Sequence, residues 1–260
     1  MDLDLTGRTA LVTGGSLGLG RAMASAFQGA GANVALVARR ENLLAQAKAA
    51  IETQNGGRVA AYSCDVTDAE AIERTVEASV GDLGPIDILV NNAGQSQTGR
   101  FEDLTDEVWQ ADLDLKLFAA IRFSRLVLPG MKERRWGRIV NILNTAAKAP
   151  PPGSAPTSVS RAAGMALTKV LAGEGAPHNV LVNALMIGSI KSDQVRRAYD
   201  RSDKSVDFET FTANSGRSLP MGRMGEAQEC GNVALFLASN AASYLTGCAI
   251  NMDGGLSRVV

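Results

Sequence analysis

Short apolar segments rich in Val, Ile and Leu alternate along this chain with longer segments of helical period. The apolar segments are expected to be strands, at residues 8–13, 33–38, 58–63, 86–90, 138–143, 180–186 and 248–252. Helical patterns lie between them, at about 19–30, 41–54, 68–80, 105–128, 156–174 and 226–239. Strands that are apolar on both faces and joined by helices are typical of a buried parallel sheet. The pattern therefore predicts a doubly wound α/β fold.

No internal repeat or long linker divides the chain, so we expect one domain over residues 1–260. Residues 148–156, KAPPPGSAP, form a proline-rich bend that cannot continue the fifth strand. The stretch 191–218 is the longest without a clear period. Long irregular insertions near the carboxyl ends of strands are more often substrate lids than linkers. We therefore interpret 191–218 as a substrate loop.

Composition excludes several classes of partner. The 26 Lys and Arg residues and 27 Asp and Glu residues give a formal net charge of −1, so no overall field attracts nucleic acid or an anionic membrane. No apolar run reaches about 18 residues, and the acidic start MDLDLTGR is unlike a secretory signal. We therefore expect a cytoplasmic protein. Cys64, Cys230 and Cys248 form no CxxC pair, which favours small core residues over a disulfide framework or a zinc site.

A glycine cluster follows the first expected strand. In TGGSLGLGR, Gly14, Gly18 and Gly20 have the spacing G-x3-G-x-G and lead directly into a helix. Glycines let the backbone turn tightly and approach a ligand, while a helix N-terminus offers free N–H groups and a partial positive charge to a pyrophosphate. A strand on one side and a helix on the other make this a predicted dinucleotide site.

The end of the second strand indicates which dinucleotide. An acidic residue there would accept hydrogen bonds from the ribose of NAD(H), but LVARRE has Arg39 and Arg40. Guanidinium groups suit a 2′-phosphate, and the Ser16 hydroxyl is a further donor for it. The alternative is that both arginines are merely solvated at a helix start. We favour NADP(H) over NAD(H).

Two more strand ends fit the same ligand. CDVTD, at 64–68, places Asp65 after the third strand, where its carboxylate can accept from the adenine amino group. NNAG, at 91–94, ends the fourth strand with small residues, which let the backbone run close to a ribose. Each signal is weak alone, and together they support the dinucleotide site.

With these residues in place, the chain resembles the short-chain dehydrogenase/reductase family over essentially its whole length. The matching stretches are TGGSLGLG (13–20), DV (65–66), NNAG (91–94), GRIVNI (137–142), VNALMIG (182–188), GRMGEAQE (222–229) and SYLTGCAINMDGG (243–255). The resemblance implies a seven-stranded Rossmann-type fold, a nicotinamide cofactor, a substrate loop after the sixth strand and often a homotetramer. It also implies cofactor contacts at Leu19, Val66, Asn92, Ala93, Gly94, Gly188 and Ile190.

The resemblance breaks at the positions of the family's four reactive side chains. Thr157 stands where the family has its proton-transferring Tyr, and Arg161 stands where it has the ribose-binding Lys four residues later. Asn144, thirteen residues before Thr157, has the position of the Ser that polarises the substrate oxygen. Lys116, seven residues after Trp109, has the position of the Asn that anchors a relay water. A further departure is Ile187-Gly188 in place of Pro-Gly.

The four replacements define what this centre can do. The pKa of a Thr hydroxyl is far too high for Thr157 to act unaided as the acid, and Arg161 stays charged, so its role is electrostatic. Asn144 can still donate an N–H to a carbonyl oxygen. Lys116 is the titratable member, and we place it in the catalytic pocket and assign it the proton transfer. The alternative is a surface ion pair with Asp112, four residues earlier on the same helix.

These residues predict an NADP(H)-dependent oxidoreductase that acts on a small-molecule carbonyl or alcohol, with a non-standard acid/base centre. Added Lys and Arg make the pocket basic, so we expect an anionic group on the substrate. Tyr199 in the substrate loop is a second candidate proton donor. One alternative function is an NADP(H)-binding sensor or scaffold without turnover, and another is a lyase or isomerase that uses the fold without redox chemistry.

Overall fold

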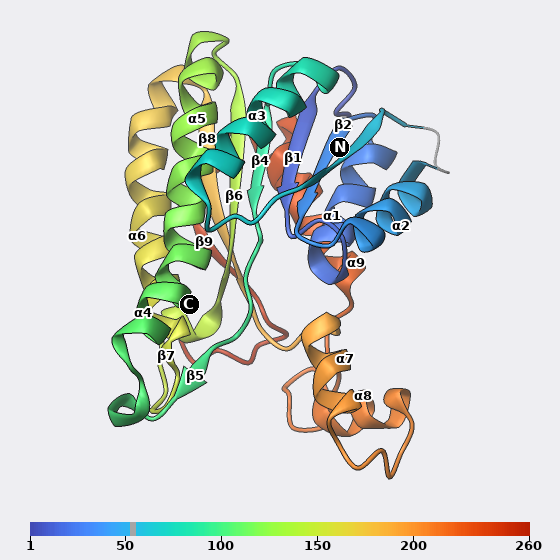
Figure 1. Cartoon of the computed structure of the whole chain (residues 1–260), viewed down its shortest axis with the longest axis vertical. Coiled ribbons are helices and arrows are strands. Elements are labelled where there is room, and N and C mark those ends of the chain that lie inside the picture. The colour runs from blue at the N-terminus through green and yellow to red at the C-terminus, as the bar shows by residue number, and fades with distance from the viewer. Residues whose placement is uncertain (53–55) are drawn as a thin grey trace.

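The computed structural model describes residues 1–52 and 56–260, and its centre is a parallel sheet. The strand order is β3-β2-β1-β4-β6-β8-β9, so the order reverses between β1 and β4 (Figure 1). All neighbouring strands in this sheet run parallel, which confirms the predicted Rossmann-type doubly wound fold. The strands are β1 (Thr9–Thr13), β2 (Asn33–Ala38), β3 (Val59–Ser63), β4 (Ile88–Asn91), β6 (Gly137–Asn144), β8 (Val180–Ile187) and β9 (Ala249–Met252).

Helices cover both faces of the sheet and bury an apolar cluster on each. One face holds α1 (Gly18–Gly29), α2 (Glu41–Glu52) and α9 (Ala227–Ala238), whose apolar side chains join one core cluster. The other face holds α3 (Ala69–Leu83), α5 (Ala119–Glu133) and α6 (Thr157–Gly175), which share a second cluster. Figure 1 shows α5 and α6 side by side, away from α1 and α2. The sheet is therefore buried on both faces, which explains its nearly continuous apolar strands.

The long helix expected at 105–128 is interrupted. It consists of α4 (Asp106–Leu113), one π-helical turn at Asp114–Phe118, and α5. Single π-turns inside helices widen the backbone spiral and occur often at functional sites. This turn contains Lys116, which is buried.

The substrate loop differs from the sequence expectation because it is not irregular. It contains α7 (Asp193–Asp200) and α8 (Phe208–Gly216), of eight and nine residues, which are too short to show a helical period in a window of about 11 residues or more. The Tyr199 ring holds them together, with centroids 5.4 Å from Phe208 and 5.5 Å from Phe211. Two very short strands, β5 (Thr98–Gly99) and β7 (Ala155–Pro156), also pair antiparallel and had no sequence signal.

Neither a membrane-spanning helix nor a metal-binding cluster occurs in the part of the chain that the structure describes. No helix there combines the length and apolar character needed to cross a membrane. No group of three or more His, Cys, Asp and Glu side chains among the same residues is arranged to hold a metal ion. The three cysteines are free thiols, and burial raises the pKa of Cys230 to about 12, which makes it an inert core residue.

Candidate active site

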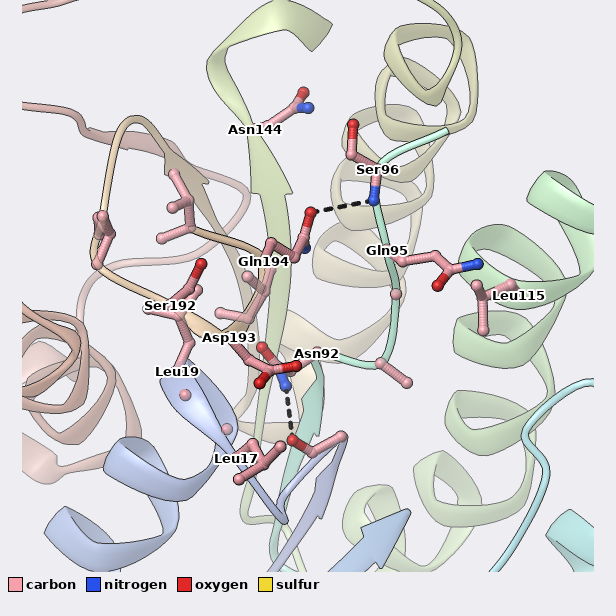
Figure 2. A pocket seen from close by; sticks show the side chains of 18 of the residues that line it. Leu17, Leu19, Asn92, Gln95, Ser96, Leu115, Asn144, Ser192, Asp193 and Gln194 are labelled. Carbon is pink, nitrogen blue, oxygen red and sulfur yellow. Dashed lines mark hydrogen bonds between the residues drawn. The ribbon is translucent and has the colours of Figure 1, made fainter. Parts of the chain in front are cut away.

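A cavity of about 510 Å³ opens at the carboxyl ends of the parallel strands, beside the reversal of strand order between β1 and β4. Figure 2 shows residues from several distant segments converging on it. Every site residue expected from the sequence lines this cavity except Lys116 and the second candidate proton donor, Tyr199. Those that do are Gly14, Ser16, Gly18, Leu19, Gly20, Arg39, Arg40, Asp65, Val66, Asn92, Ala93, Gly94, Asn144, Thr157, Arg161, Gly188 and Ile190. Ligands of open α/β sheets bind at this place in the fold.

The glycine loop has the geometry of a phosphate cradle. Gly14 and Gly18 have φ values of +65° and +52°, which only glycine adopts without strain. A Cβ on Gly20 would lie 2.2 Å from the Gly14 carbonyl oxygen, so the close approach of helix and loop also requires glycine there. Leu17 at the start of α1 offers no side-chain cap, and the first N–H groups of the helix remain available to an anion.

The far end of the cavity suits an adenosine phosphate. The Arg39 and Arg40 side chains are exposed at its rim and form no hydrogen bond or ion pair within the described part of the chain. Ser16 is buried and lines the same cavity. The Asp65 carboxylate accepts from the Thr67 amide and hydroxyl at 3.0 and 2.8 Å. These bonds, with a smaller effect of the Arg39 charge, lower the pKa of Asp65, so it remains an acceptor.

Asn92 joins two strand ends. Its Nδ2 donates to the carbonyl oxygens of Thr13 at 2.9 Å and Gly14 at 3.3 Å, a contact drawn in Figure 2. The backbone N–H groups of Asn92 and Ala93 donate to the Thr13 hydroxyl at 2.9 and 3.0 Å. The Asn92 side chain therefore holds the loop in shape, and residues 92–94 line the cavity.

Lys116 is buried one layer behind the cavity wall. Its ammonium donates to the Asp112 carboxylate and, at 2.6 Å, to the Thr157 hydroxyl. The Lys116 and Asp112 side chains are each 1 % exposed. The ion pair considered from the sequence therefore forms, but its expected surface position is wrong. Lys116 does not line the cavity itself, but its partner Thr157 does.

Burial makes Lys116 easier to deprotonate than a surface lysine. Burial and the Arg161 charge lower the pKa of the ammonium from 10.5 to about 8, although the hydrogen bond to Asp112 opposes this. Burial also lowers the pKa of Arg161 to about 10, with the Asp112 charge opposing, so the guanidinium stays charged at neutral pH. Arg161 uses Nη1 to bond the Ile142 carbonyl at 2.8 Å.

The Thr157 hydroxyl has its hydrogen bonds filled by the protein. Its oxygen accepts from Lys116 and, at 2.9 Å, from the Gln97 amide. Its single proton goes to the Gln97 carbonyl at 2.6 Å, with the Asp112 carboxylate a weaker partner at 3.4 Å. A hydroxyl donates one hydrogen bond and accepts two. Thr157 must therefore break its bond to Gln97 before it can donate to a ligand.

Asn144 and Tyr199 differ in their relation to the cavity. Asn144 ends β6, and its buried Oδ1 has no hydrogen-bond partner among the described residues. The unpartnered Oδ1 can accept a hydrogen bond from a ligand. The Tyr199 hydroxyl instead donates to the Val206 carbonyl at 3.2 Å, within the substrate loop, and the residue does not line the cavity. This removes Tyr199 as a proton donor at the site.

Sequence reasoning missed several residues of the site. The substrate loop reaches the cavity through Gln194, whose Oε1 accepts from the Ser96 amide at 3.2 Å (Figure 2). Ser160 donates to the Asp112 carboxylate, and the Gln97 amide donates to the Thr157 hydroxyl, so both hold partners of Lys116. Polar residues in a charged loop or on a helix carry no motif, so no local signal could have found these partners.

Comparison with known proteins places the chain in a family. A family model described as enoyl-(acyl carrier protein) reductase matches residues 14–257. Acetoacetyl-CoA reductase of Shinella zoogloeoides is 34% identical over 248 residues, covering 95% of this chain and 98% of that protein. The chain belongs to the short-chain dehydrogenase/reductase family. Human dehydrogenase/reductase SDR family member 4 is 36% identical over 252 residues, covering 96% of this chain and 88% of that protein.

Solved structures of short-chain oxidoreductases show the same fold. A short-chain oxidoreductase from Pseudomonas aeruginosa PAO1, bound to NADPH and containing an atypical catalytic centre, has 39% identity and a TM-score of 0.92, covering 99% of each chain. L-sorbose reductase from Gluconobacter frateurii, complexed with NADPH and L-sorbose, has 31% identity and a TM-score of 0.93, covering 100% of each chain. Family membership thus shows an oxidoreductase of this type.

Proposed function

We propose that this protein is an NADP(H)-dependent oxidoreductase that interconverts a carbonyl and an alcohol at a non-standard acid/base centre. The NADPH bound in two similar structures supports the choice of cofactor. The local chemistry supports it too, since Arg39, Arg40 and Ser16 gather where a 2′-phosphate would lie. When bound, the nicotinamide supplies or receives the hydride.

The chain's own residues fit this cofactor. The uncapped N-terminus of α1 and the cradle of Gly14, Gly18 and Gly20 would hold the pyrophosphate. Asp65 retains acceptor capacity for the adenine amino group. At the other end of the cavity, the Arg161 guanidinium would donate to ribose hydroxyls. Gly188 and the Ile190 backbone would meet the carboxamide.

The contact between Lys116 and Thr157 is the observation that carries the proposed mechanism. Asn144 donates from its amide to the substrate oxygen, and Arg161 adds a positive charge nearby. Lys116 is the proton source for carbonyl reduction. The proton passes through Thr157, whose hydroxyl turns from the Gln97 carbonyl to the substrate oxygen as it receives a proton from Lys116.

The charge balance of the centre favours an anionic substrate. Lys116 and Arg161 carry two positive charges when protonated. Asp112 is the one negatively charged group that affects the pKa values of both. A carboxylate, phosphate or thioester-carrier anion would complete this balance.

The proposal also includes a homotetramer that acts in the cytoplasm on a small-molecule substrate. Sedimentation equilibrium tests the assembly.

A second candidate function is an NADP(H)-binding sensor or scaffold without turnover. The observation that favours it is the Thr157 hydroxyl, which the protein already saturates with hydrogen bonds. A hydroxyl that never leaves Gln97 would deliver no proton, while the cofactor cradle would bind as before.

One set of variants separates the two functions. NADPH binding is measured by fluorescence, and NADPH oxidation is measured with a panel of neutral and acidic carbonyl compounds for wild type, Lys116→Met and Thr157→Tyr/Arg161→Lys. We expect tight binding in all three and a large loss of turnover in Lys116→Met. Full turnover in Lys116→Met would overturn the assignment of the proton. If wild type binds NADPH but oxidises it with no compound, and the double variant does turn over, the protein is a sensor.

A further inference from the structure

Asp112 lies at the centre of a buried polar group to which neither the resemblance nor the proposed mechanism assigns a role. It is 4 % exposed, and it sits in the last turns of α4, facing α6. We propose that Asp112 is a positioning residue of the acid/base centre: its carboxylate holds the Lys116 ammonium against the Thr157 hydroxyl, and Ser160 holds the carboxylate. The proposal rests on the proposed function for its catalytic consequence.

The two carboxylate oxygens have separate partners. Oδ1 accepts from the Lys116 ammonium, and Oδ2 accepts from the Ser160 hydroxyl at 2.6 Å. The Ser160 oxygen also lies 3.1 Å from the Thr157 carbonyl, but its single proton favours the shorter bond to the charged group. A carboxylate bonded at both oxygens inside the protein has one orientation. Asp112 therefore holds the Lys116 ammonium in one position.

In that position the Lys116 ammonium contacts the Thr157 hydroxyl. Thr157 and Ser160 are three residues apart on α6, so they share a face of that helix, and both meet the Asp112 and Lys116 pair. A free lysine side chain has many rotamers, and fixing it costs about 1.5–2 kcal/mol of conformational entropy. Asp112 offsets this cost, because it binds the ammonium in the position from which it also reaches Thr157.

Asp112 also determines when Lys116 carries its proton. The charged groups facing the ammonium are Asp112 from α4 and Arg161 from α6. Asp112 is the one whose charge favours the protonated form, whereas burial and Arg161 oppose it. Neutralising Asp112 leaves only the effects that remove the proton. The titration of Lys116 should then move to lower pH, a change that general loosening of the structure would not produce.

The test is a titration of Lys116 by NMR in the full-length protein with ε-¹⁵N-labelled lysine, the resonance being assigned by its loss in Lys116→Arg. In Asp112→Asn we expect the Lys116 midpoint to fall by about one pH unit or more. In Ser160→Ala the carboxylate keeps its charge and loses one competing donor, so we expect a rise of about half a unit or less. NADPH fluorescence serves as the control, and its titration should be unchanged in both variants.

Measurements of kcat and KM then distinguish a positioning role from a purely structural one. With an accepted substrate, Ser160→Ala should lower kcat several-fold at an unchanged KM, and Ser160→Thr, which retains the hydroxyl, should restore it. An unchanged or raised midpoint in folded Asp112→Asn would overturn the proposal. If Asp112→Asn does not fold, an unchanged midpoint together with an unchanged kcat in Ser160→Ala would overturn it. The NMR titration needs no substrate, so absence of turnover in wild type would count against the proposed function alone.

Discussion

The Lys116 ammonium donates a hydrogen bond of 2.6 Å to the Thr157 hydroxyl, across 41 residues of sequence. The contact joins a π-helical turn to the first residue of α6, and it connects a buried titratable group to a residue that lines the cavity. In the proposed mechanism the two residues divide the proton transfer, since the lysine titrates and the threonine lines the cavity.

The pH dependence of turnover should report Lys116. With a pKa of about 8, the ammonium is mostly protonated at neutral pH and loses its proton as the pH rises. Carbonyl reduction needs the protonated form, so kcat should fall as the pH passes upward through about 8, and alcohol oxidation should show the opposite trend. Lys116→Arg keeps the charge without titrating, so its profile should lack this inflection. The same inflection in both proteins would assign the pKa to another group.

Removing the Thr157 hydroxyl should destabilise the fold. Thr157→Val retains the shape but removes the acceptor of the Gln97 amide and one of the two acceptors of the buried Lys116 ammonium, and a buried group that loses its partner costs about 1–3 kcal/mol. Thr157→Ser retains the hydroxyl and serves as the matched variant. Urea unfolding should show the larger loss of unfolding free energy for Thr157→Val. Equal losses in the two variants would mean that the methyl group, not the hydrogen bonds, matters here.

The two arginines at the cavity rim should determine the preference between cofactors. Arg39→Ala/Arg40→Ala should weaken NADPH binding about ten- to a hundredfold, because a charge-assisted hydrogen bond to phosphate is worth about 1.5–3 kcal/mol. Binding of NADH, which lacks the 2′-phosphate, should change little. The control is Arg74→Ala, which removes an exposed arginine of α3 that pairs with Glu70. Fluorescence titrations with both cofactors measure the two affinities. Equal weakening for NADPH and NADH would show that the arginines do not bind the 2′-phosphate.

A side chain at Gly20 should damage the phosphate cradle. A Cβ there would meet the Gly14 carbonyl oxygen at 2.2 Å and the Asn92 amide at 2.6 Å, so loop and helix must separate. Gly20→Ala should therefore lower both the melting temperature and NADPH affinity. Gly81→Ala is the control, since a Cβ on Gly81 of α3 meets nothing within 4 Å and alanine is the better helix former. Wild-type affinity in Gly20→Ala would contradict the assignment of this loop as the phosphate cradle.

Most of the fold follows from local pattern. Each of the seven apolar segments overlaps a strand of the sheet, because parallel strands buried on both faces must be apolar along their length. The short strands β5 and β7 and the helices α7 and α8 lacked any such signal. Strands of two residues and helices of eight or nine residues form through tertiary contacts. One such contact is that of the Tyr199 ring with Phe208 and Phe211.

The sequence by itself determined which residues meet at the expected cofactor cradle, and the tertiary structure decided the arrangement of the proposed acid/base centre. Residues such as Gly14, Arg39 and Asp65 follow parallel strands whose carboxyl ends meet at one edge, so strand order alone brings them together. The partners of Lys116 are different. Whether its ammonium faced solvent or met Thr157, and whether Asp112 was buried, depended on how a π-turn and α6 pack against each other, and that packing joins residues more than 40 positions apart.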